Sequence, residues 1–191
     1  KNTWEKYKDQ LNEVFDYNED YKHYISKNKT ERACVKDSIK LAEEKGFKPL
    51  ESFDTLKSGD KVYVTNREKN IALFIIGEKP LTEGMRILGA HIDSPRMDLK
   101  QNPLYESEGF TLADTHYYGG IKKYQWVTIP LSLYGVVCKK DGTVVDVVIG
   151  EDENDPVVGI SDLLIHLSAD QLDKKAAKVI EGENLDVTLG N

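Results

Sequence analysis

Cysteine is scarce in this chain, and long apolar runs are absent. Only Cys34 and Cys138 occur among the 191 residues, and they show no metal-ligand spacing. Each cysteine lies in an apolar pattern, so we expect both to be buried free thiols. Free thiols are typical of proteins of the reducing cytoplasm, which we expect to be the location of this chain. No apolar run approaches the roughly 20 residues that cross a bilayer, so we expect no membrane partner. Residues 1–6 also lack the apolar segment of a signal peptide.

Basic residues are in the minority. The 33 acidic residues outnumber the 26 basic ones and give a net charge of −7. Because nucleic-acid binding needs a basic surface to contact phosphates, this balance argues against a nucleic-acid partner. The length suits one domain or two small ones, and we find no internal repeat or low-complexity tract.

The first half of the chain predicts helices followed by strands. Apolar residues spaced by three and four predict a helix over residues 3–26, bent near Asn18, whose aromatic stripe packs in the core. A second helix is predicted from Thr30, as its N-cap, to Lys45, with Gly46 ending it. Its expected buried side consists of Cys34, Val35, Ile39, Leu41 and Ala42.

Three strands are predicted next, over residues 61–65, 70–77 and 85–92. The continuous apolar run at 70–77 is typical of a strand buried on both faces in the middle of an α/β sheet. Helices followed by buried strands indicate an α/β fold class.

The sequence changes character near residue 100. Residues 124–138 and 143–149 flank a hairpin turn at 139–142, and an acidic loop follows at 151–156. Because no long helix separates these strands, we expect a mostly antiparallel β region. A short helix is predicted from Ser168, with Gln171 completing a capping box and Gly182 near the helix end. We therefore place a domain boundary between residues 1–99 and 100–191.

The stretch from Arg86 to Pro95 carries the clearest chemical signal. An apolar run leads to His91 and Asp93, followed by a proline. If the strand extends that far, both side chains lie on one side of its C-terminal end, where α/β sheets bind ligands. A histidine whose tautomer is fixed by a carboxylate is a common unit of metal sites. The alternative is a chance His-x-Asp pair, which occurs often.

The longer string Gly-Ala-His-Ile-Asp-Ser-Pro-Arg, residues 89–96, resembles the first metal-binding motif of the M18 family of zinc aminopeptidases. The resemblance implies that His91 is a metal ligand and that Asp93 supports the site. It also implies part of an α/β/α metallopeptidase catalytic domain in residues 1–99. Residues 100–191 would then form an inserted, mostly antiparallel β domain, incomplete here, through which M18 enzymes dimerise.

The other three histidines are less direct candidates. His23 fits a solvated helix face, and the turn that follows His116 accounts for its polar setting. His166 lies in an apolar segment, where a histidine is usually a hydrogen-bonded core residue. However, the M18 β domain carries an Ile-His-Leu segment just before a helix, matched here by Ile165–Leu167. The resemblance implies that His166 is a metal ligand or a substrate contact supplied across a subunit interface.

Two departures from the family pattern qualify this resemblance. Eukaryotic members carry a Thr-Trp-Phe-Asp-Arg string where residues 124–128 read Tyr-Gln-Trp-Val-Thr, so the chain is more similar to the bacterial branch. A strict preference for acidic N-terminal residues is therefore not implied. The remaining ligands and the glutamate base also have no counterpart, since Glu43-Glu44 lies in a predicted helix. We expect this chain to be the N-terminal part of a longer protein.

The resemblance implies a metal-dependent aminopeptidase that releases N-terminal amino acids, acidic ones among the candidates, from peptide substrates. Two zinc ions per active site and a homo-oligomer are implied with it. Two alternatives remain open, a metal-dependent hydrolase of another amide and a non-catalytic oligomerisation module. Lys122, Lys123 and Arg96 could meet an acidic side chain, although solvated surface is the simpler role for each.

Overall fold

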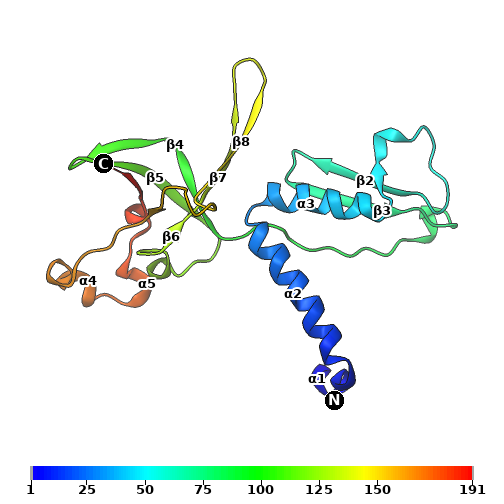
Figure 1. The fold of residues 1–191 in the computed structure, drawn as a ribbon, viewed down its shortest axis with the longest axis horizontal. Coiled ribbons are helices and arrows are strands. Elements are labelled where there is room, and N and C mark those ends of the chain that lie inside the picture. The colour runs from blue at the N-terminus through cyan, green and yellow to red at the C-terminus, as the bar shows by residue number, and fades with distance from the viewer. Residues whose placement is uncertain (1, 191) are drawn as a thin grey trace. The chain divides into compact units, whose positions relative to one another are not determined.

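The computed structural model describes residues 2–190 and divides into two compact units, Lys1–Ser94 and Pro95–Asn191. We call them the N-terminal unit and the C-terminal unit and describe each by itself (Figure 1). The division falls a few residues before the boundary expected near residue 100. The assignment of the two parts to a catalytic and a dimerisation domain stays a prediction.

The N-terminal unit begins with helices interrupted earlier than predicted. α1 (Thr3–Lys6) and a 3-10 turn (Lys8–Gln10) precede α2 (Leu11–Lys27), which runs through Asn18 without a break. The predicted bend at Asn18 is therefore wrong. Core packing of the aromatic stripe is also wrong, because Trp4, Phe15 and Tyr21 are exposed. The C-terminal end of α2 is anchored, because Tyr24, Lys27 and Asn28 bond to side chains of the next helix.

That next helix, α3 (Glu31–Glu44), has the predicted limits. The Thr30 hydroxyl accepts a hydrogen bond from the Ala33 backbone at 3.2 Å, and Gly46 follows the helix with a φ of +83°. Cys34, Val35 and Ala42 are buried as expected, whereas Leu41 is exposed. Leu41 lies seven residues after Cys34 and therefore on the same side of α3, but two turns farther along that side it is 48% exposed, so its predicted burial is wrong.

A three-stranded sheet of order β1-β2-β3 packs against α3. It contains β1 (Lys48–Pro49), β2 (Lys61–Asn66) and β3 (Asn70–Ile75), with a 3-10 turn at Leu50–Ser52 and another after the sheet at Leu81–Glu83. β2 is central and buries Val62 and Tyr63. β3 is an edge strand with Leu73, Phe74 and Ile75 exposed. Burial of this strand on both faces was predicted wrongly, because β2 is its only partner among the described strands.

The segment that carries the His-x-Asp motif is not a strand. Residues 84–95 belong to no helix or strand, and Ile87 and Leu88 are exposed. The predicted strand over 85–92 is thus wrong for the described structure. A strand persists only where a neighbour takes up its backbone hydrogen bonds, and no described strand lies in register with this segment.

The C-terminal unit is built on a five-stranded sheet of order β4-β5-β10-β9-β6, in which every pair is antiparallel. The antiparallel character agrees with the prediction. The strands are β4 (Arg96–Ser107), β5 (Phe110–Tyr118), β6 (Pro130–Leu131), β9 (Val158–Gly159) and β10 (Val187–Gly190). A cluster of buried residues packs on this sheet and forms the core of the unit: Ala113, Val127, Val158, Ile160, Ile180, Leu185 and Val187.

A separate hairpin pairs β7 (Leu133–Cys138) with β8 (Val144–Ile149) around the predicted turn. In Figure 1 this yellow hairpin extends away from the five-stranded sheet. Cys138 lies exposed at its outer end, so the prediction of a buried thiol is correct for Cys34 and wrong for Cys138. A two-stranded hairpin has no layer of its own to bury the side chain.

Short helical turns connect the remaining strands. They are the 3-10 turns at Lys123–Gln125, Ile165–Leu167 and Gly182–Asn184, with α4 (Ala169–Leu172) and α5 (Ala176–Val179). The single helix predicted after Ser168 is thus two short ones. The capping box is wrong as well, because the Gln171 amide donates to Asp162 at 2.9 Å instead. Across residues 2–190, no helix is both long enough and apolar enough to span a bilayer.

Candidate metal-binding segment

The two motif residues meet as their spacing predicts. His91 Nδ1 lies 3.1 Å from Asp93 Oδ1 and 3.1 Å from the Asp93 backbone oxygen. Two oxygen acceptors favour a proton on Nδ1, which leaves Nε2 as the ring's lone-pair donor. The His91 side chain is 85% exposed, so Nε2 is open to a ligand. This arrangement is that of a metal-binding histidine whose second nitrogen is held by a carboxylate.

Cys34 attaches the motif to the helix beneath it. Its Sγ lies 3.5 Å from the Asn28 carbonyl at the end of α2 and 3.8 Å from the Ile92 carbonyl in the motif, so these two acceptors share the single S–H donor. Burial raises the pKa of the Cys34 thiol, which keeps it protonated and able to donate. Sequence reasoning predicted the burial of Cys34 but missed this contact, because its partner lies 58 residues away.

The described residues suit one zinc ligand and its partner, but not a complete zinc site. Zinc in proteins takes three or four nitrogen, sulfur or oxygen ligands, and imidazole is among the preferred ones. No group of three or more histidine, cysteine or acidic side chains that could hold a metal occurs within residues 2–190. His91 and Asp93 can therefore supply one ligand with its orienting carboxylate.

His166 is a surface residue. It lies in the 3-10 turn Ile165–Leu167 and is exposed, and so are Ile165 and Leu167 beside it. The core interpretation of this histidine is therefore wrong, because its side chain is exposed, and it is the neighbouring Ser168 that is buried, with its hydroxyl donating to the Ile165 carbonyl at 3.1 Å. A ligand or substrate-contact role for His166 stays a prediction. His91 belongs to the N-terminal unit and His166 to the C-terminal unit.

The two remaining histidines show no sign of a site. His116 is exposed on β5, where its ring stacks on Tyr117 with centroids 5.6 Å apart. His23 is exposed on α2. Both placements agree with the simpler interpretation of each residue as a surface side chain.

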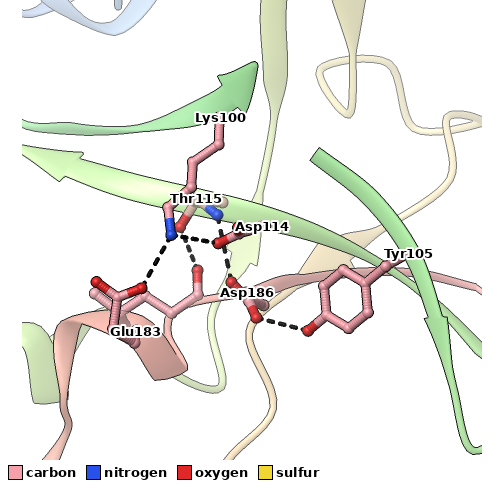
Figure 2. A network of polar contacts seen from close by, with 7 residues as sticks. Lys100, Tyr105, Asp114, Thr115, Glu183 and Asp186 are labelled. Carbon is pink, nitrogen blue, oxygen red and sulfur yellow. Dashed lines mark hydrogen bonds and ion pairs between the residues drawn. The ribbon is translucent and has the colours of Figure 1, made fainter. Parts of the chain in front are cut away.

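A polar network that sequence reasoning missed joins β4 and β5 to the segment before β10 (Figure 2). Lys100 lies 2.9 Å from carboxylates of both Asp114 and Glu183, which raise its pKa. Beside it, the Tyr105 hydroxyl donates to Asp186 at 2.6 Å, and this bond with burial raises the pKa of Tyr105 to about 12. Glu183 and Asp186 lie some 80 residues from Lys100 and Tyr105, so no local pattern could reveal these contacts.

Thr115 completes this network. Its hydroxyl donates to the Leu185 carbonyl, and its backbone N–H donates to Asp186 at 3.3 Å. Both Thr115 and Leu185 are buried. We assign the network a structural role, because its groups bind one another and fix residues 183–187 against the sheet.

Comparison with known proteins places the chain among metallopeptidases. A family profile described as "Aminopeptidase I zinc metalloprotease (M18)" matches residues 24–190. The chain is 58% identical over 196 aligned residues to a probable M18 family aminopeptidase 1 of Clostridium acetobutylicum, covering 100% of this chain and 42% of that protein.

Solved structures agree with the sequence comparison. The M18 aminopeptidase of Thermotoga maritima matches with a TM-score of 0.86 and 44% identity, over 94% of this chain and 39% of that one. The S. cerevisiae mApe1 dodecamer matches with a TM-score of 0.67 over 89% of this chain and 37% of that one, but its 23% identity shows likeness of fold alone. The chain spans about two fifths of the curated relatives that it matches.

Proposed function

Because this chain belongs to the M18 family of zinc metalloproteases, we propose that the protein containing it is a metal-dependent aminopeptidase. It releases amino acids one at a time from the N-termini of peptides. The observation that carries the proposal is the His91–Asp93 pair, a ligand-ready imidazole held by a carboxylate inside the family's matched region. The N-terminal unit belongs to the catalytic domain, and the C-terminal unit to an inserted domain.

His91 would hold one of two zinc ions through Nε2. When bound, the zinc ions would supply a nucleophilic water and Lewis acidity for the peptide carbonyl. Asp93 accepts a hydrogen bond from Nδ1–H and so fixes both the tautomer and the direction of the ring, which makes Nε2 a better electron-pair donor to the metal. Cys34 restrains the backbone between these two residues through the Ile92 carbonyl. The general base and the remaining ligands come from residues outside this chain.

His166 contributes from the C-terminal unit. Its exposure leaves the imidazole available to a substrate or a metal of another subunit, and its apolar neighbours Ile165 and Leu167 favour burial against a protein surface. Self-association through the C-terminal unit is part of this proposal, and it gives a homo-oligomer. The working compartment is the reducing cytoplasm, where Cys34 and Cys138 stay free thiols.

The first test uses the full-length protein and a panel of peptides that differ in their N-terminal residue. We expect free amino acids to be released, the release to stop with a chelator, and zinc to restore it. His91→Ala should abolish release, whereas His23→Ala, which alters an exposed histidine on α2, should leave it unchanged. Absence of release under zinc-replete conditions would refute the peptidase and favour a hydrolase of another amide or a non-catalytic assembly protein.

The Asp93 role is tested by metal affinity. Loss of the carboxylate should weaken zinc binding by about 10–100-fold, as is typical when the hydrogen-bond partner of a metal-binding histidine is removed. The measurement is competition with a chromophoric chelator for Asp93→Asn beside the unaltered protein. Full zinc affinity and full activity in Asp93→Asn would contradict the orienting role.

A further inference from the structure

Residues 161–167, which we call the histidine loop, carry His166 and lie at the surface of the C-terminal unit. Every residue of this loop is exposed, whereas Ile160 before it and Ser168 after it are buried. The Ile160 carbonyl accepts the Thr128 backbone N–H at 2.7 Å, which fixes the start of the loop to the core. Packing therefore holds the two ends of the histidine loop and does not hold the part that carries His166.

A side-chain hydrogen bond closes the histidine loop across its base. Asp162 Oδ1 accepts the side-chain amide N–H of Gln171 at 2.9 Å and the backbone N–H of Leu163 at 2.8 Å. Gln171 lies on α4 (Figure 1), so one carboxylate joins the start of the loop to the helix that follows it. We call this contact the Asp162–Gln171 clasp. Since its partners are nine positions apart, the clasp encloses His166.

The backbone on either side of His166 is also hydrogen-bonded. The Leu167 N–H donates to the Leu164 carbonyl at 2.8 Å, and the Ser168 hydroxyl donates to the Ile165 carbonyl at 3.1 Å. These bonds close the 3-10 turn that contains the histidine. Together with the clasp, they give the loop a defined shape before anything binds to it. A preformed loop loses less conformational entropy when it makes a contact.

Burial separates a positioning role of the clasp from a purely structural one. A bond that stabilises the fold secures residues that pack, whereas residues 163–167 within the clasp are exposed and contribute little to the core. Losing an exposed hydrogen bond changes the free energy of unfolding little. What the clasp sets is the direction in which the loop, and with it the His166 imidazole, leaves the surface.

We propose that Asp162 and Gln171 are positioning residues that hold His166 in the orientation in which it meets a substrate or a metal. This inference rests on the role proposed for His166 above and adds the two side chains that maintain it. A carboxylate suits this task, because hydrogen bonds to a charged acceptor are about twice as strong as neutral ones. Here one oxygen of that carboxylate accepts two of them.

The test measures peptide release by the full-length protein and begins with Asp162. We expect Asp162→Ala to lower kcat/KM about 5- to 20-fold. Asp162→Asn should keep at least about a third of kcat/KM, because its amide oxygen can still accept both bonds. The matched control is Asp173→Ala, which removes an exposed carboxylate just after α4 and should change kcat/KM less than about twofold. An unchanged urea-unfolding midpoint in each variant would show that the fold is intact.

A double-mutant cycle shows whether the clasp acts through His166. His166→Ala should itself lower kcat/KM, and adding Asp162→Ala to it should cause no further loss, because the group that the clasp orients is then absent. Additive losses, equal losses in Asp162→Asn and Asp162→Ala, or full activity of His166→Ala would each overturn the proposal.

Hydrogen exchange followed by mass spectrometry tests the clasp without relying on catalysis. Fragments that span residues 161–168 should exchange about 5- to 20-fold faster in Asp162→Ala than in the unaltered protein, and no faster in Asp173→Ala. Unchanged exchange in Asp162→Ala would refute the clasp whether or not peptides are cleaved. Faster exchange in a protein that releases no amino acid would refute the peptidase and support the clasp.

Discussion

Replacing Thr115 by valine removes one buried hydrogen bond and almost nothing else. Valine has nearly the same shape as threonine, but it cannot donate to the Leu185 carbonyl. Both residues are buried, so water does not easily replace the lost donor. A buried acceptor that loses its partner costs about 1–3 kcal/mol, and the absence of a buried hydroxyl offsets part of that loss. We expect a net destabilisation of about 1–2 kcal/mol.

Native-state hydrogen exchange measures this loss where it arises. Exchange protection of β5 and β10 amides should fall about 5- to 30-fold in Thr115→Val, which corresponds to that range of free energy. The matched control is Thr111→Val, the same change at an exposed position of β5, with an expected effect within about 0.5 kcal/mol. Equal protection in the two variants would refute the energetic role of the Thr115 bond.

Two further predictions concern the same unit. The Asp186 hydrogen bond raises the pKa of Tyr105 in the folded protein from 10 to about 12. The stability that this bond contributes is therefore complete below pH 10 and is lost as the pH rises through 12. Unfolding titrations should show this alkaline loss of stability in the unaltered protein and a smaller loss in Tyr105→Phe. Gly182→Ala should destabilise the unit by about 1–3 kcal/mol in urea unfolding, because the new Cβ would lie 2.9 Å from the Tyr117 ring. Gly109→Ala adds a Cβ with no neighbour within 4 Å, so its destabilisation reports the cost of a positive φ alone.

Features set by neighbours in sequence were predictable. The cap at Thr30, the stop at Gly46 and the turn at 139–142 all depend on residues within a few positions. The His91–Asp93 contact belongs with them, because a spacing of two residues brings the side chains together even without a strand. Local geometry therefore predicted the central pair of the candidate site.

Features that depend on distant partners were not predictable. Burial of β3 and a strand at 85–92 both require neighbouring strands, and the described chain offers β3 one partner and residues 85–92 none. The contacts of Cys34 with Ile92 and of Lys100 with Glu183 join residues 58 and 83 positions apart. Hydrophobic pattern indicates that a residue can be buried, but it does not say by what, as Leu41 and Cys138 show.

The long separations within the C-terminal unit also determine when it can fold during synthesis. β5 pairs with β10, and Lys100 and Tyr105 bind Glu183 and Asp186, so the sheet lacks its centre until about 80 more residues have been translated. At roughly 5–20 residues per second, that takes about 4–16 seconds. The β4–β5 ribbon leaves the ribosome with an open edge during this interval, whereas β2 and β3 pair at once across a short turn. The sheet of the C-terminal unit is therefore completed later during synthesis than the β2–β3 pair of the N-terminal unit.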